Sequence, residues 1–288
     1  MALLYLSALH LTVENQLNGA LFPLGYRTAS NMTSANTTRF NAEAAAWDSN
    51  PNVVVASGLA HRAILERFRG RSSPTSKLDV LEIGCGTGLL TLALAPHFRS
   101  VTAVDAAEGM IAALQSKLSA EGCETNNVRA VAAMLEDPDD ERIRPDAAAF
   151  SRGVEGGTAL KPRRFDLVVS HLVLHHIPDL LAVLKTMFGC LKTGGQVMLT
   201  DFEDFGPEAR RFHPESRMEG VERHGIKRTD IADLLERAGF VDVRIETAFK
   251  MDKAVETEPG SGDKGPIMTF PFLICKGMKP GAGRSEPQ

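Results

Sequence analysis

The sequence predicts an α/β fold in which helices cover both faces of a mainly parallel, doubly wound sheet. Along most of the chain, short apolar segments with strand character alternate with amphipathic segments of helical period. A glycine-rich turn joins the first of these strands to the helix that follows it, and this arrangement is typical of doubly wound nucleotide-binding proteins. Near the end of the chain, two strand-like segments are separated by a stretch that looks like a long hairpin connection.

The individual elements follow from local periodicity and from breaker residues. Thr229 is expected to cap one helix and Gly239 to end it. Helices are expected at about 53–68, 89–98, 178–191 and 229–238, and around Met110, Leu114 and Leu118. Strands are expected at 78–83, 101–104, 128–133, 165–169, 196–200, 241–247 and 268–275.

The domain organisation follows from composition. We expect one domain of about 200 residues with extensions rather than two full domains. The predicted parts are a loosely ordered extension at 1–38, a helical segment and linker at 39–76, and the main domain at 77–276. Inside the domain we expect a mobile insertion at 137–163 and a long hairpin connection at 252–266, and after it a disordered tail at 277–288.

Composition and charge exclude several classes of protein. The 288 residues include 32 Lys and Arg against 36 Asp and Glu, a net charge of −4, so no nucleic-acid partner is expected. No apolar run reaches the roughly 18 residues of a membrane span. The four cysteines are widely spaced, which predicts no metal site and free thiols in a reducing compartment. We expect a cytoplasmic protein, with a mitochondrial location as the alternative. Its oligomeric state stays open.

The glycine-rich turn is the strongest chemical signal. Gly84, Gly86 and Gly88 follow a buried strand and precede a helix, so the backbone can approach a ligand closely near free N–H groups. The pattern is G-x-G-x-G, and Leu89 stands where the dinucleotide fingerprint G-x-G-x-x-G has its third glycine. Glu82 lies two residues before the first glycine, at the carboxyl end of the strand.

Asp105 ends the second strand, 21 residues after Gly84. In doubly wound folds this position places a carboxylate against the two hydroxyls of a ribose. The spacing therefore predicts an adenosine-type ligand with an unphosphorylated ribose. The alternative is that Asp105 only caps the helix that begins near Ala106.

Four motifs in the right order resemble the class I S-adenosylmethionine-dependent methyltransferases. They are Leu81-Glu-Ile-Gly-Cys-Gly-Thr-Gly88, Val104-Asp105, Phe165-Asp-Leu-Val-Val-Ser170 with Leu174-His-His-Ile-Pro-Asp179, and Leu191-Lys-Thr-Gly-Gly195. The chain is most similar to the small-molecule branch related to ubiquinone and menaquinone C-methyltransferases, over about residues 39–276. The resemblance implies a Rossmann-like sheet of seven strands whose last two, at 241–247 and 268–275, form an antiparallel hairpin.

The resemblance also implies roles for single residues toward S-adenosylmethionine. Glu82, Gly84 and Gly86 would face its methionine half, Asp105 would hold the ribose, and Ala106 and Met110 would lie near the adenine. After the third strand, either the Leu135 backbone or Glu136 would contact the adenine amine. Ser170 and His171 would lie where the cofactor meets the acceptor. The remaining members of the implied cofactor set are Cys85 and Gly88.

Methyl transfer from a sulfonium is an in-line displacement that needs positioning in a dry site, and no metal. A general base helps when the acceptor is a hydroxyl, a thiol or an acidic carbon. His171, His175 and His176 follow the fourth strand, and His224 lies in a later loop. We name His176, His171 and His224 as candidate catalytic residues. The alternative for each is a structural role, such as a hydrogen bond to the backbone.

Trp47 is the only tryptophan and precedes the glycine turn by roughly thirty-five residues. In the family that the chain resembles, this segment packs over the cofactor as a lid, so Trp47 would shield the site from water. The alternative is that Trp47 only anchors the N-terminal extension on the domain.

These observations together predict an S-adenosylmethionine-dependent methyltransferase (EC 2.1.1.-) that acts on a small-molecule acceptor. One alternative is an NAD-dependent oxidoreductase, which Leu89 disfavours. The other is a non-catalytic nucleotide-binding module with the same fold. The sequence leaves open whether carbon, oxygen, nitrogen or sulfur receives the methyl group, because one fold serves many acceptors.

Overall fold

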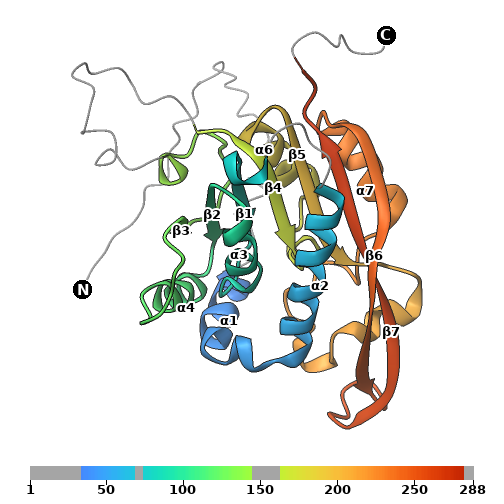
Figure 1. Cartoon of the computed structure of the whole chain (residues 1–288). Helices are drawn as coiled ribbons and strands as arrows, with labels where there is room; N and C mark the ends of the chain where they lie inside the picture. Colours follow the sequence, from blue (N-terminus) through green and yellow to red (C-terminus); the bar gives the residue numbers. More distant parts are fainter. Residues whose placement is uncertain (1–33, 69–73, 145–162, 282–288) are drawn as a thin grey trace, which may run out of the picture.

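A seven-stranded sheet forms the centre of the molecule, with strand order β3-β2-β1-β4-β5-β7-β6 (Figure 1). The structure is a computed structural model that describes residues 34–68, 74–144 and 163–281. Strands β1 to β5 are parallel, whereas β7 pairs antiparallel with β5 and β6 pairs antiparallel with β7. The mainly parallel sheet and its antiparallel C-terminal hairpin are thereby confirmed. The strands are β1 (Asp79–Ile83), β2 (Ser100–Asp105), β3 (Val128–Ala132), β4 (Phe165–His171), β5 (Leu191–Phe202), β6 (Val241–Glu256) and β7 (Lys264–Met278).

Helices cover both faces of this sheet, as the alternating pattern predicts. In Figure 1, α2 and α3 lie in front of the strands and α6 and α7 lie behind them. The helices are α1 (Ser34–Glu43), α2 (Pro51–Phe68), α3 (Leu89–Leu94), α4 (Glu108–Leu118), α6 (Leu180–Cys190) and α7 (Arg228–Arg237). Among the described helices, none combines the length and the apolar character needed to cross a membrane.

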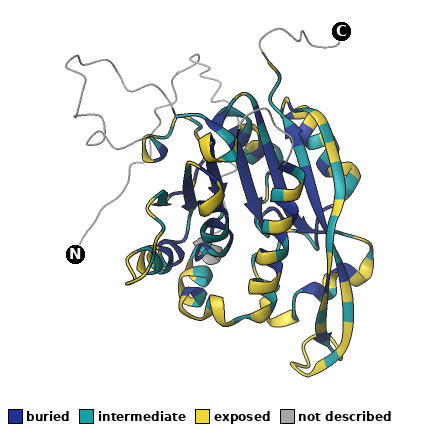
Figure 2. Cartoon of the chain, viewed as in Figure 1, coloured by how far each residue is buried: buried dark blue, intermediate teal, exposed yellow. Residues whose placement is uncertain are grey.

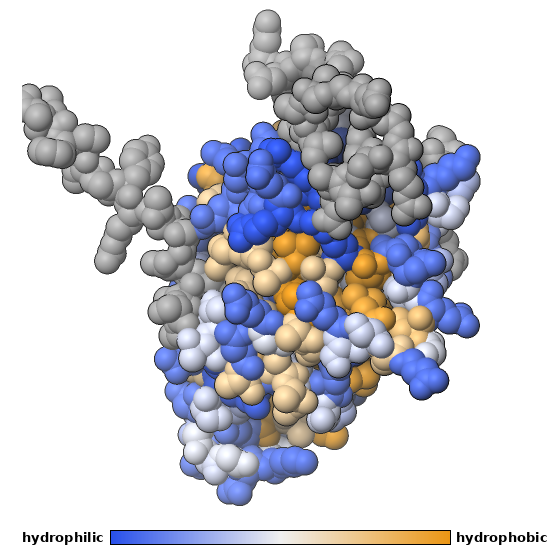
Figure 3. Space-filling view, turned by 90° about the vertical axis from the view of Figure 1, so that its left-hand side faces the viewer, coloured by the Kyte–Doolittle hydropathy of each residue, from blue (hydrophilic) through white to orange (hydrophobic). Residues whose placement is uncertain are grey.

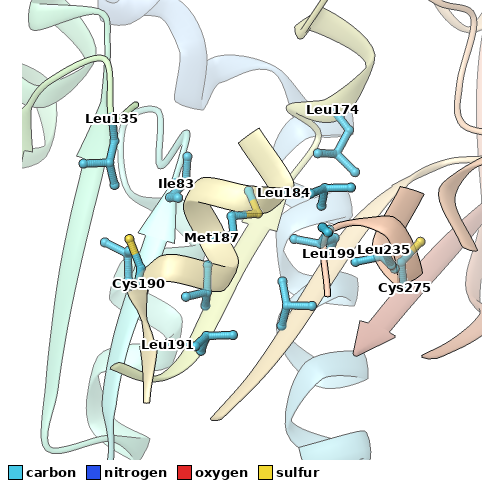
Figure 4. Close-up of a cluster of buried hydrophobic side chains, with 14 of the residues drawn as sticks. Ile83, Leu135, Leu174, Leu184, Met187, Cys190, Leu191, Leu199, Leu235 and Cys275 are labelled. Carbon is cyan, nitrogen blue, oxygen red and sulfur yellow. The ribbon is translucent and has the colours of Figure 1, made fainter. Parts of the chain in front are cut away.

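Two hydrophobic cores form because successive strand residues point to opposite faces. In β7, Leu273 and Cys275 join the core under α6 and α7, while Ile274 joins the core under α2 and α3. Figure 4 shows Leu184 and Met187 of α6 above the strands of the first core. Strands β1, β2, β4 and β5 are buried along most of their length, whereas the edge strands β3 and β6 are more exposed (Figure 2). Because both faces are covered, the sheet edge that carries the strand carboxyl ends is left to form a site.

The C-terminal hairpin is longer than the sequence predicts. β6 continues to Glu256 and β7 begins at Lys264, so only residues 257–263 connect them, and the expected connection at 252–266 is wrong. Asp252 and Lys253 interrupt the alternation of apolar residues that indicates a strand, although both residues pair across the hairpin. Charged residues are common on edge strands because they discourage pairing with other chains.

Several smaller boundaries also differ. Helix α7 begins at Arg228 after the N-cap residue Lys227, so Thr229 lies in its first turn and is not the cap. Of the expected insertion, residues 137–144 are described, and Ile143 is fully buried in the larger core. Residues 34–38 of the expected extension belong to α1. The rest of that extension, part of the linker, most of the insertion and the end of the tail lie outside the described residues.

Candidate active site

A cavity of about 370 Å³ opens at the carboxyl ends of β1, β2 and β4. It lies where the strand order reverses between β1 and β4, which is where open α/β sheets bind ligands. The glycine turn, the end of β2 and the segment after β3 line one part of it, and the segment from β4 to α6 lines another. Residues of α1, of α2 and of the 3-10 helix η1 (Ala44–Ser49) complete the wall.

The glycines of the turn between β1 and α3 have different structural tasks. Gly84 has a φ of +74°, and a Cβ there would lie 2.3 Å from Val173 Cγ2. Gly88 has a φ of +84° and would place a Cβ 2.4 Å from Leu114 Cδ1. Gly84 and Gly86 line the cavity, whereas Gly88 caps α3 and packs toward α4 without lining it. A side chain at Gly84 or Gly88 would therefore distort the turn.

Asp105 lies at the end of β2 and lines the cavity beside this turn. Its Oδ2 accepts a hydrogen bond from Gly86 N and its Oδ1 accepts one from Ala107 N, both at 2.8 Å. The second bond closes a local turn ahead of α4 and is not a helix cap, because α4 begins at Glu108 after the N-cap residue Ala107 and has no side-chain cap. Burial raises the pKa of this carboxyl above its ordinary value. The two bonds leave further lone pairs on both oxygens, so the carboxylate can still accept hydrogen bonds from a ligand.

Glu82 lines the cavity at the end of β1, although its side chain is almost fully buried. Its Oε2 accepts a hydrogen bond of 2.5 Å from Thr91 Oγ1. Burial, and then the negative charge of Asp105, raises the pKa of Glu82 to about 8. The neighbouring Cys85 thiol also lines the cavity, and its pKa is raised by burial. Glu82 and Cys85 are therefore mainly neutral at pH 7.

The predicted adenine side of the cavity is mostly apolar. Ala106 and Met110 from the start of α4 line it, together with Leu135 and Glu136 from the segment after β3. Met110 and Leu135 are buried. Ser170 is different, because its hydroxyl donates a 2.7 Å hydrogen bond to Ile83 O inside the sheet, and it does not belong to the cavity wall.

Phe40 and Trp47 bring the N-terminal helices over the cavity. Both line it, with ring centroids 5.7 Å apart in an edge-to-face contact. Thr87 Oγ1 of the glycine turn donates a 2.5 Å hydrogen bond to Asp48 Oδ1, and Lys117 forms an ion pair with Asp48. These contacts hold the segment around Trp47 against the turn. Its position above the cavity agrees with a lid, and the tether to the turn agrees with an anchor.

The candidate catalytic histidines have separate environments. His171 lines the cavity, with Nδ1 2.8 Å from Thr200 Oγ1, and burial lowers its pKa to about 4. His176 also lines it, and its Nδ1 donates a 2.8 Å hydrogen bond to Gly220 O. Burial lowers the pKa of His176 to about 3. Both rings are therefore neutral at pH 7. His224 does not belong to the cavity wall.

Several residues of the cavity wall are not among those that the sequence predicts. Phe40 has no local signal, because only the folded chain brings α1 to the cavity. Leu172 follows β4 and has a φ of +57°. This conformation is strained for a branched side chain, and residues strained in this way are often found at functional sites. Asp179 lines the cavity and caps α6 through Ala182 N, a role that its place before an apolar run could have suggested.

The chain is similar to several curated methyltransferases. It is 30% identical over 191 residues to a malonyl-[acyl-carrier protein] O-methyltransferase of Bacillus cereus, which covers 66% of this chain and 59% of that protein. It is 29% identical over 121 residues to a ubiquinone biosynthesis O-methyltransferase of Azotobacter vinelandii, over 42% of this chain and 43% of that protein. The chain thus spans less than two thirds of the length of these relatives.

Solved structures support the fold. The YcgJ protein of Bacillus subtilis matches with a TM-score of 0.54 at 15% identity, over 77% of this chain and 99% of that one. A phosphoethanolamine N-methyltransferase of Haemonchus contortus, solved with S-adenosyl-L-methionine, matches with a TM-score of 0.52 at 17% identity, over 84% of this chain and 60% of that one. A family model described as a methyltransferase domain matches residues 56–245, and the chain belongs to this family.

Proposed function

We propose that this chain is an S-adenosylmethionine-dependent methyltransferase (EC 2.1.1.-) that methylates a small-molecule acceptor by in-line displacement. The observation that carries the proposal is the position of Asp105, whose carboxylate faces the cavity beside the backbone of Gly86. Family membership and the placement of the cavity at the switch point of the sheet agree with it.

The residues present fit this cofactor. The cavity volume of about 370 Å³ lies within the roughly 300–1,000 Å³ of small-molecule pockets. The backbone at Gly84 and Gly86 would approach the methionine half, with Glu82 beside it. Asp105 would accept hydrogen bonds from the ribose hydroxyls, and Ala106, Met110 and Leu135 would pack against the adenine. Glu136 or the Leu135 backbone remains the proposed contact to the adenine amine, while Ser170 would act only through the Ile83 carbonyl.

Bound S-adenosylmethionine supplies an electrophilic methyl group on a sulfonium. The chain would position an acceptor opposite that group and exclude water, a task for the rings of Phe40 and Trp47 at the cavity wall. His171 and His176 offer neutral imidazoles to the same cavity. With pKa values of about 4 and 3, they are weak bases, so we propose that His171 orients the acceptor by hydrogen bonding.

We further propose the chemical class of the methyl acceptor. The two curated relatives named above are O-methyltransferases, which favours an oxygen acceptor. The mostly apolar lining around Val173, Ile177 and Val183 favours a substrate with a hydrocarbon portion. All four cysteines are free thiols, and on this ground we propose a cytoplasmic location.

Calorimetric titration with S-adenosylmethionine, S-adenosylhomocysteine and NAD tests the proposal. The wild-type chain should bind both sulfur nucleotides and not NAD, and Asp105→Asn should weaken that binding at least tenfold. The control is Asp263→Asn in the exposed hairpin loop, which should bind as the wild type does. Tight binding of NAD alone would replace the proposal with an oxidoreductase. Binding without methyl transfer to any of a panel of hydroxylated acceptors would favour a non-catalytic module.

A further inference from the structure

Three histidines meet beside the cavity in a way that the proposed methyl transfer does not require. His175 and His176 belong to the 3-10 helix η5 (Leu174–His176), and His213 directly follows the 3-10 helix η6 (Pro207–Phe212). One ring nitrogen from each lies within 4.8 Å of those of the other two. Within the described residues this is the one group of three ligand-type side chains gathered so closely.

The hydrogen bonds of this histidine cluster resemble those around metal ligands. Nδ1 of His175 donates to the carboxylate of Asp201 at 2.9 Å, and Nδ1 of His176 donates to Gly220 O at 2.8 Å. Histidines that bind metals usually donate one ring N–H to a carboxylate or a backbone carbonyl, which fixes the tautomer and directs the other nitrogen at the metal. In a neutral imidazole whose Nδ1 donates in this way, Nε2 is the nitrogen with a lone pair for a metal.

Asp201 is built into the sheet as a fixed acceptor. It is fully buried in β5, and besides the His175 ring it accepts hydrogen bonds from the backbone N–H groups of His175 and Phe202. These backbone hydrogen bonds fix the position of the Asp201 carboxylate. A buried carboxylate held in this way orients the His175 ring rigidly.

His213 supplies the third nitrogen from another part of the chain. Its Nδ1 is buried and has no hydrogen-bond partner among the described residues. A buried polar atom without a partner is costly and calls for an explanation such as an unseen ion. The rings of Phe202 and Phe212 pack against His213, with centroids 5.5 and 5.1 Å away, so the donors sit against an apolar wall.

We propose that His175, His176 and His213 form a binding site for one divalent transition-metal ion, with Zn²⁺ as the representative. Three imidazoles favour zinc and related ions over Mg²⁺ or Ca²⁺, which prefer oxygen ligands. Metal–nitrogen bonds of about 2.0–2.1 Å require the three nitrogens to approach more closely than 4.8 Å, so the proposal includes a rearrangement of these side chains when the ion binds.

The geometry also assigns a place for a further ligand. Three protein ligands leave one position of a tetrahedral ion open, as in catalytic zinc sites. His176 belongs both to the cluster and to the cavity wall, so the open position would be reachable from the cavity. An anionic oxygen of a bound small molecule is the chemistry that would occupy it. The metal site itself does not depend on the proposed methyl transfer.

Metal binding can be measured directly on the tag-free, chelator-treated full chain. Titration with Zn²⁺ against a chromophoric chelator should give one site per chain, and Mg²⁺ should not compete. Co²⁺ should produce the intense visible d–d bands of a four-coordinate ion. His213→Ala should lose the stoichiometric site, and Asp201→Asn should weaken it by about 10–100-fold, as changes around metal ligands do.

The matched control is His97→Ala, because His97 is exposed and lies outside the cluster. It should bind Zn²⁺ as the wild type does, and circular dichroism should show that every variant is folded. If the wild-type chain binds no stoichiometric Zn²⁺, or if folded His213→Ala and His97→Ala bind it equally well, the proposal is overturned. These readouts do not involve methyl transfer, so they are independent of whether the proposed function holds.

Discussion

Glu82 is a buried carboxyl whose protonation couples stability to pH. Burial and Asp105 raise its pKa from about 4.5 to about 8. A raised folded-state pKa contributes stability that is complete below the unfolded pKa and is lost as the pH rises through the folded value. Glu82→Gln keeps an acceptor for Thr91 Oγ1 without a titrating proton. We therefore expect the wild-type chain to lose about 1.4 kcal/mol per pH unit relative to Glu82→Gln between pH 5 and 8.

Urea denaturation of the ligand-free chain at several pH values measures this difference. Glu66→Gln is the control, because Glu66 is exposed on α2 and its replacement should leave the pH profile of the wild type unchanged. If the stability of Glu82→Gln and of the wild-type chain falls in parallel up to pH 8, then Glu82 is already ionised and its assigned protonation state is wrong.

Trp47 offers an optical report on the cavity, because it is the only tryptophan of the chain and lines the cavity. A ligand that packs beside Trp47 removes water from the indole. We expect S-adenosylhomocysteine to produce a saturable change in tryptophan emission with the midpoint found by calorimetry. An unchanged emission spectrum at saturation would place the ligand away from Trp47 and contradict the lid.

The predictable part of the site is the part that lies close together in sequence. Gly84, Gly86 and Asp105 come from one strand–turn–helix unit and the strand after it, so their spacing alone places them at one sheet edge. Phe40 and His213 reach the same region from segments 173 residues apart in sequence. Their meeting depends on how α1 and the segment after β5 pack, which no local pattern encodes.

At the scale of elements, helix α2 contains a glycine with no structural task. Gly58 is exposed in the middle of the helix, and a Cβ there would meet nothing within 4 Å. Alanine loses less backbone entropy than glycine on folding, so Gly58→Ala should stabilise the chain by about 0.5–1 kcal/mol. Thermal denaturation followed by circular dichroism checks this.

Gly84→Ala provides the contrast to Gly58→Ala. Its Cβ would clash with Val173 at a positive φ, so the same change should destabilise the folded chain. If Gly58→Ala lowered the melting temperature as well, the exposed helical environment assigned to Gly58 would be wrong.

Elements with clear periodicity were predictable, and those stabilised by distant contacts were not. The central parallel strands β1, β2 and β4 are buried on both faces and appear in the sequence as apolar runs. The outer half of the hairpin is different. The pairing of β5 with β7 ends at the Phe202–Phe272 pair, and the part of β7 that precedes Phe272 extends beyond the end of β5. There its stability comes from a separate aromatic cluster that includes Phe202, Phe212 and Phe270, which only the folded chain assembles.

At the scale of the whole molecule, apolar side chains fill the two cores on either side of the sheet and are also exposed in places on the surface (Figure 3). Figure 3 shows one side of the molecule, where apolar side chains gather toward the middle and hydrophilic ones surround them. The sheet order explains why a single chain of α/β units leaves an opening at one edge: β1 and β4 lie next to each other but are followed by helices on opposite faces. The cavity is therefore a consequence of topology, and its chemistry is a consequence of the residues placed there.

The aromatic cluster joins the hairpin to the body of the protein, and Phe272 is one of its buried members. Phe272 is fully buried, stacks on Phe249 with centroids 4.6 Å apart and lies 5.8 Å from the ring of Phe212. Phe272→Ala should lower the free energy of unfolding by about 3–5 kcal/mol, because it removes a large buried side chain and leaves a cavity. Ile267→Ala, at a position 72% exposed in the same strand, should change it by less than about 0.5 kcal/mol. Urea denaturation of both variants distinguishes the cases: equal losses would mean that the outer hairpin does not pack on the body, and the aromatic cluster would then not support His213.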